Sequence, residues 1–135
     1  MDQMFFESRS RYGFEETINR LSEIISEGGW RVIHIHDLQE TMRKNGKTVD
    51  SVKVIELCKP DYAYRLLSEE GLRIYSNMMP CRISIYEKKD GKTYVSRLNS
   101  AMLSAVIGGV VEDVMSLAYR DAENFIRKIE DNQFL

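Results

Sequence analysis

The dipeptide Asp90-Gly91 constrains the fold more than any other feature of the sequence. It lies between two runs of alternating apolar and polar residues within positions 80–99. Asp-Gly between such runs is a strong hairpin signal, because a type I′ turn needs positive φ at both central residues. With a two-residue loop, Lys89 opposes Lys92, and every later pair follows from it. The sequence therefore predicts an antiparallel hairpin with a defined register.

That register assigns the hairpin side chains to two faces of a sheet, since cross-strand partners share a face. The first face is apolar and contains Cys81, Ile83, Ile85 and Leu98. The second face is mostly polar and contains Arg82, Ser84, Tyr86, Val95, Arg97 and Asn99. A cysteine on the apolar face behaves as a small hydrophobic residue, and burial raises its thiol pKa. We therefore expect Cys81 to be structural.

The remaining segments predict helices and further strands from apolar periodicity, glycine stops and a proline at a helix start. Helices are expected over residues 14–27, 38–44, 60–71 and 110–131, and strands over 4–11, 30–38 and 51–58. This order favours an α+β fold in which a largely antiparallel sheet carries helices on one face.

Size and charge exclude several classes of protein. The 135 residues, 43% of them apolar, fit a single domain over 1–135 that buries a core without a metal or disulfides. A formal charge of −2 provides no basic field, so nucleic acid is not an expected partner. No apolar run is long enough for a signal peptide or a membrane helix, so we expect a cytoplasmic protein without a membrane partner.

Alternation in the neighbouring strands extends the polar face. If Ile35 faces the core together with Ile33, then His34 and His36 face away from it. The same pattern in residues 51–58 turns Glu56 and Cys58 away from Ile55 and Leu57. The face opposite the helices then collects His34, His36, Glu56, Cys58, Arg82, Ser84, Arg97 and Asn99. Such residues can bind anions, transfer protons or ligate a metal, although an ordinary solvated face or a dimer interface has the same pattern.

The first functional hypothesis is a non-enzymatic binding or assembly module, within a homodimer. The predicted register places Arg82 opposite Asn99 and Ser84 opposite Arg97, so two guanidiniums lie diagonally on one surface. They bind a small carboxylate or phosphate unless Glu56 neutralises them. The proposed ligand-binding residues are His34, His36, Glu56, Arg82, Arg97 and Asn99.

Two alternatives remain open at this stage. The sequence does not identify a cofactor. Cys58 precedes Pro60 at an expected helix start, where the helix dipole lowers a thiol pKa, so it is a candidate catalytic thiolate with a histidine base. His34 and His36 share one face and are candidate metal ligands, with Glu56 or Cys58 completing the set. The methionines mostly follow core spacing and are interpreted as core residues.

Four segments together resemble the domain of unknown function 302 family: YGFEETINRL, HIHDLQETMRKNGK, VIELCKPDYAYRLL and MMPCRISIYEKKDGKTYVSRLNS. The resemblance runs from about Tyr12 to the final helix. It implies a small fold of the TATA-box-binding-protein-like and helix-grip-like group, in which a curved antiparallel sheet wraps long helices. Cys58 and Cys81 match the family's two cysteine positions. Lys59 stands where the family often has asparagine, so the resemblance does not imply a role that needs a neutral amide at this position. The resemblance implies no activity.

Overall fold

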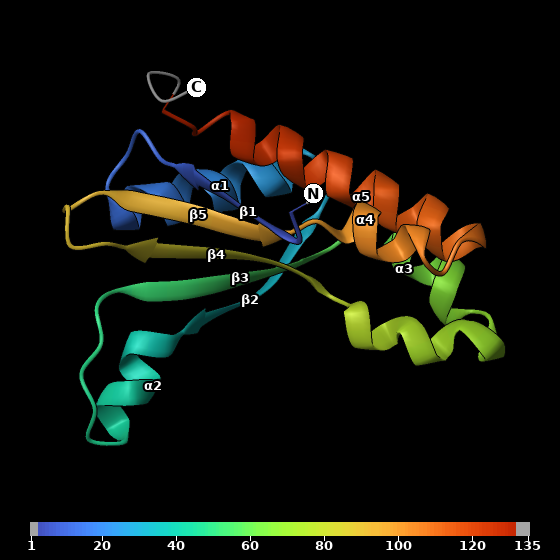
Figure 1. Cartoon of the computed structure of the whole chain (residues 1–135), viewed down its shortest axis with the longest axis horizontal. Coiled ribbons are helices and arrows are strands. Elements are labelled where there is room, and N and C mark those ends of the chain that lie inside the picture. Colours follow the sequence, from blue (N-terminus) through green and yellow to red (C-terminus); the bar gives the residue numbers. More distant parts are fainter. Residues whose placement is uncertain (1–2, 132–135) are drawn as a thin grey trace.

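The computed structural model describes residues 3–131, which fold around a five-stranded antiparallel sheet of order β1-β5-β4-β3-β2 (Figure 1). The strands are β1 (Phe5–Arg9), β2 (Arg31–Asp37), β3 (Val52–Cys58), β4 (Cys81–Glu87) and β5 (Thr93–Leu98). The helices are α1 (Phe14–Glu27), α2 (Leu38–Lys44), α3 (Pro60–Leu67), the 3₁₀ helix η1 (Glu70–Met78), α4 (Ser100–Ala105) and α5 (Gly109–Arg127).

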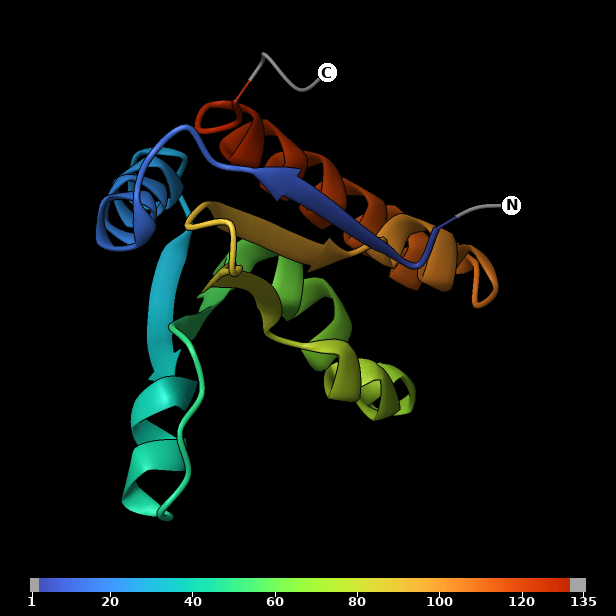
Figure 2. The same cartoon turned by 60° about the vertical axis from the view of Figure 1, so that its left-hand side comes forward.

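The two long helices cover one face of the sheet, and the other face is open. In both views α1 and α5 lie on one side of the strands, whereas α2 projects on the opposite side (Figures 1 and 2). We call the side of α1 and α5 the covered face and the opposite side the open face. The predicted α+β class, with an antiparallel sheet and helices on one face, is therefore confirmed.

The core lies between the covered face and the two long helices. Each element contributes side chains at its own period, about 3.6 residues for a helix and two for a strand. The fully buried members include Leu21, Ile25, Ile55, Leu57, Ile83, Ile85, Val95, Ile126 and Ile129. Gly28 ends α1 against α5, where a Cβ atom would overlap the ring of Phe125. The close approach of the two helices thus explains a glycine at this position.

The predicted hairpin register is wrong by one residue. The N–H of Lys88 donates to the carbonyl of Lys92 at 3.1 Å, and the N–H of Gly91 donates to Lys88 at 3.0 Å. The loop therefore has three residues, with Gly91 at φ +78° in the left-handed region that glycine adopts without strain. Ile83 consequently pairs with Arg97 rather than with Leu98.

A shift of one residue moves every side chain of β5 to the opposite face. Val95, expected on the polar face, is fully buried in the core, and Arg97 lies with it on the covered face. Ser96 and Leu98 point to the open face instead. The expected pairs of Arg82 with Asn99 and of Ser84 with Arg97 do not form, because Ser84 pairs with Ser96. Cys81 packs against the core as predicted.

Three further local differences separate expectation from structure. A register irregularity between Val32 and His34 displaces Ile33, whose side chain is 57% exposed rather than in the core. The helix expected over residues 60–71 ends at Leu67 and is followed by η1. The short helix α4 carries too few turns to show a periodic pattern and was not expected.

No helix within residues 3–131 combines the length and the apolar character needed to cross a membrane.

Candidate functional site

Glu56 is the centre of a polar cluster on the open face. It lies on β3 and is the cross-strand partner of His34 on β2 and of Arg82 on β4. Its carboxylate is hydrogen-bonded to Nε2 of His36 and lies 3.7 Å from Nε of Arg82. The rings of His34 and His36 meet edge to face, with 4.4 Å between centroids. Four of the predicted ligand-binding residues are therefore neighbours.

The side chains around Glu56 stabilise its carboxylate. The hydrogen bond from His36 holds the pKa of Glu56 below its ordinary value, and the charge of Arg82 acts in the same direction. The described part of the chain contains no group of three or more His, Cys, Asp and Glu side chains that could hold a metal ion. His34 and His36 thus share a face as expected, but without further ligands of these types arranged around a metal.

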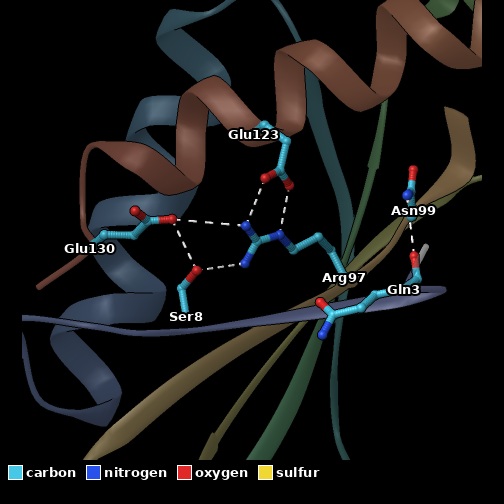
Figure 3. Close-up of polar contacts among 6 residues, drawn as sticks. All are labelled: Gln3, Ser8, Arg97, Asn99, Glu123 and Glu130. Atoms are coloured by element: carbon cyan, nitrogen blue, oxygen red, sulfur yellow. Dashed lines mark hydrogen bonds and ion pairs between the residues drawn. The ribbon is translucent and has the colours of Figure 1, made fainter. Parts of the chain in front are cut away.

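Arg97 belongs to a different cluster, on the covered face (Figure 3). Its guanidinium donates to both oxygens of Glu123 on α5, at 2.6 Å each, and to Oγ of Ser8 at 2.7 Å. Glu130 lies 3.8 Å from the same guanidinium and accepts a hydrogen bond from Ser8. With 8% of its side chain exposed, Arg97 ties β5 to α5 and β1. Its expected place on the open face is corrected accordingly.

Asn99 also has a structural role in the fold. Its Oδ1 accepts a hydrogen bond from the N–H of Met102 at 3.2 Å, which caps the N-terminus of α4. Its Nδ2 donates to the carbonyl of Gln3 at 3.2 Å (Figure 3). Because Asn99 lies beyond β5, it does not extend the polar face that the predicted register had assigned to it.

A large cavity opens where β4 and β5 separate. The two strands pair as far as Ile83 and Arg97. Beyond this pair, Arg82 pairs with Glu56 on β3 and Leu98 pairs with Phe5 on β1, so the strands no longer contact each other through a ladder. A cavity of about 330 Å³ occupies this gap. We call it the wedge cavity.

The wedge cavity has a mouth of mixed polar and apolar side chains and a mostly apolar inner wall. Side chains from the open face line its mouth: Phe5, Arg82, Ser84, Ser96 and Leu98. Helix α5 supplies much of the inner wall through Met115, Ala118, Tyr119 and Ala122. Of the residues predicted as ligand-binding, Arg82 and Arg97 line the cavity, whereas the histidines and Glu56 do not. The apolar period of residues 110–131 predicted a helix there, but no feature of the sequence indicated that its side chains border a cavity.

The two cysteines are partly buried neighbours at the ends of adjacent strands. Cys81 pairs across the sheet with Leu57, the residue before Cys58. Burial raises the pKa of the Cys81 thiol to about 11, with a smaller effect from Cys58. Burial also raises the pKa of Cys58, the opposite of the lowering expected from the start of α3. Cys58 pairs with Arg31 on β2, so the structure gives no support to a Cys58 thiolate with a histidine base.

Comparison with known proteins agrees with this architecture. The family model described as domain of unknown function DUF302 matches residues 6–132. The chain belongs to the DUF302 family. A crystal structure of an uncharacterized conserved DUF302 protein from Bacillus stearothermophilus superposes with a TM-score of 0.85 at 19% identity, covering 96% of this chain and 100% of that one. No curated protein matched the chain. At this identity, the likeness between the two DUF302 chains shows a shared fold.

Proposed function

We propose that this protein binds a small, largely apolar carboxylic acid in the wedge cavity, without an enzymatic step. The observation that carries the proposal is a cavity of about 330 Å³ with Arg82 at its mouth and apolar side chains of α5 on its inner wall. Volumes of this size are typical of small-molecule sites, which are mostly apolar with a few polar groups that fix orientation.

The charges around the two arginines support one orientation of the ligand. Arg97 is already surrounded by Glu123 and Glu130, and this surplus of negative charge repels a further carboxylate. Arg82 is 66% exposed, and its 3.7 Å approach to Glu56 is longer than a hydrogen bond. Its guanidinium is therefore free to turn toward a ligand. The carboxylate binds at Arg82, and the apolar part extends toward α5.

The chemistry of the lining residues supports binding rather than catalysis. Cys81 lines the wedge cavity, but its raised pKa keeps it a thiol at neutral pH. Ser84 and Ser96 also line it, and no histidine stands among the lining residues to act as their base. The histidines of the open face are turned to Glu56 and to each other.

A thermal-shift experiment with hexanoate tests this proposal. Hexanoate combines an apolar tail with a carboxylate, hexanol retains the tail alone, and inorganic phosphate provides an anion without a tail. We expect hexanoate to raise the melting temperature of the wild type more than either comparator does. Arg82→Ala should lose this shift, Arg82→Lys should retain part of it, and Arg43→Ala, on α2, should retain all of it.

Two outcomes would contradict the proposal. In the first, hexanoate stabilises the wild type no more than hexanol does, which removes the role of the carboxylate. In the second, the Arg82→Ala protein is stabilised as strongly as the Arg43→Ala protein, which moves the anion away from Arg82.

A cytoplasmic location stays a prediction. We further propose that two copies of the chain associate beside the mouth of the wedge cavity. Within residues 3–131, β1 is an edge strand whose one strand partner is β5, and Phe5 is 65% exposed there next to the exposed Met4. Covering this apolar edge with a second copy removes it from water. We expect sedimentation velocity to give a dimer mass and Phe5→Glu to give a monomer; a monomeric wild type at high micromolar concentration would contradict this.

A further inference from the structure

A second, smaller cavity lies among β3, β4, α3 and α5. Its volume is about 30 Å³, sufficient for one water-sized or ion-sized occupant. Four sulfur-bearing side chains line it, namely Cys58, Met79, Cys81 and Met115. Most of the other lining residues are apolar, with Lys59 as the charged exception. Two thiols and two thioethers are thus gathered around one small space, which we call the sulfur cavity.

Both cysteines border the sulfur cavity from the ends of adjacent strands. Cys58 ends β3, Cys81 begins β4, and Cys81 pairs with Leu57, the residue before Cys58. The two cysteines meet at the cavity where the ladder between these strands stops. Met79 precedes Cys81 by two residues, and Met115 belongs to the buried face of α5. The sequence predicts the methionines as core residues, and Met115 is indeed buried. Met115 nevertheless lines the same cavity as the two cysteines.

Hydrogen bonds fix two aromatic residues of the sulfur cavity. Trp30 Nε1 and the Tyr62 hydroxyl both donate to Oδ2 of Asp121, at 3.1 and 3.0 Å. The rings of Trp30 and Tyr62 also meet edge to face, with 5.8 Å between centroids. Both aromatic residues line the cavity. Because α5 and two aromatic rings are joined through one carboxylate, this part of the cavity lining is held in place.

We propose that the sulfur cavity binds a single soft monovalent cation, Cu(I), through the sulfur atoms of Cys58 and Cys81, with Met79 and Met115 beside them. Thiolate and thioether ligands select Cu(I), whereas zinc sites use thiolate, imidazole and carboxylate ligands. No imidazole or carboxylate lines this cavity. The donor set therefore differs from the one considered for His34 and His36.

The charge balance of binding is favourable at this position. Each thiol releases one proton, so Cu(I) and two neutral thiols give a bis-thiolate complex of net charge −1 and two protons in solution. The two thioethers add no charge. The ammonium group of Lys59 is next to Cys58 in the chain and lies 4.8 Å from the ring centroid of Tyr62. It offsets the negative charge of the complex.

Competition with the Cu(I) chelator bicinchoninate tests the proposal on the full, reduced chain under anaerobic conditions. We expect the wild type to withhold one equivalent of Cu(I) from the chelator. Cys58→Ser and Cys81→Ser should each weaken binding by at least about tenfold. Met115→Leu should weaken it less, and Met42→Leu, on α2, should leave it unchanged because Met42 is outside the cavity.

Copper X-ray absorption of the wild-type complex provides a second, mutation-independent readout. A first coordination shell that contains sulfur alone supports the proposed site. Because this measurement uses the wild type, it tests the proposal even if a serine variant does not fold. The proposal is overturned if the wild type yields its copper as readily as the Cys58→Ser/Cys81→Ser double variant. It is also overturned if either single variant retains wild-type affinity, or if nitrogen or oxygen ligands surround the copper. Hexanoate stabilisation is measured without metal, so either proposal can fail alone.

Discussion

Two arginines on neighbouring strands of the same sheet have opposite surroundings. Arg97 is 8% exposed on the covered face and is held by Glu123, Glu130 and Ser8. Arg82 is 66% exposed on the open face, and within residues 3–131 its polar contact is the 3.7 Å approach to Glu56. The first guanidinium has its donors satisfied by the fold, and the second retains donors for a ligand.

The difference arises from one residue in a hairpin loop. With two loop residues, Arg97 would share a face with Arg82, and the sheet would present two unsatisfied guanidiniums. With three, the pleat turns Arg97 toward α5 and leaves Arg82 alone. The comparison teaches that register and burial, and not residue type, determine whether an arginine in an alternating strand stabilises the fold or is available to bind a ligand.

The largest effect expected from this comparison is that of Arg97→Ala. Removing one partner from a buried ion pair leaves the carboxylates of Glu123 and Glu130 uncompensated, which costs about 3–5 kcal/mol in the free energy of unfolding. Urea denaturation measures the loss. In a double-mutant cycle, Glu123→Ala combined with Arg97→Ala should destabilise less than the sum of the two single changes. Additive single effects would show that the ion pair does not couple α5 to β5.

An intermediate effect is expected for Asn99→Ala, which tests the second residue that the register moved away from the open face. The change removes the side chain that caps α4 and its hydrogen bond to the carbonyl of Gln3. We expect a loss of about 1 kcal/mol in the free energy of unfolding, the usual size for an N-cap. Hexanoate should stabilise this variant as it does the wild type. Loss of that stabilisation would show that Asn99 contributes to hexanoate binding.

The sequence predicted the class of the fold because the class depends on local patterns. The apolar period in residues 14–25 indicates a helix, and alternation in residues 81–87 indicates a strand, whichever partners they later find. Register does not follow in this way. A glycine with positive φ at Gly91 satisfies a two-residue and a three-residue loop equally, so the signal at Asp90-Gly91 predicted the hairpin and misassigned Arg97.

The candidate site could be predicted only in part, for a related reason. His34, His36, Glu56 and Arg82 gather as expected, since their strands pair in order and alternate regularly at these positions. The wedge cavity depends on where β4 and β5 separate and on which side chains of α5 lie behind them. Those are long-range contacts between segments distant in sequence, and no periodicity within either segment encodes them.

The smallest effect is expected for Arg82→Ala. An exposed arginine with one long ion pair contributes little, so the free energy of unfolding should change by less than about 0.5 kcal/mol at neutral pH. A loss as large as that of Arg97→Ala would contradict the comparison.

The pH dependence of the Glu56 cluster sharpens the same point. The pKa of Glu56 lies below its ordinary value of 4.5, so its contribution to stability is present above 4.5 and is lost as pH falls through the lowered pKa. Glu56→Gln should therefore differ from the wild type at pH 7 and converge with it in acid. A stability difference that grows in acid would have the wrong sign.

The most direct test of the account follows the Nε–Hε signals of both arginines by ¹⁵N NMR while hexanoate is added. The account predicts that the Arg82 signal shifts until the binding site is saturated with hexanoate, as its guanidinium turns from Glu56 to the ligand. The Arg97 signal should stay in place and exchange slowly with water, because Glu123 holds its Nε–H at 2.6 Å. A shift of Arg97 with Arg82 unmoved, or no shift of either, would contradict the assignment of one arginine to the fold and the other to a ligand.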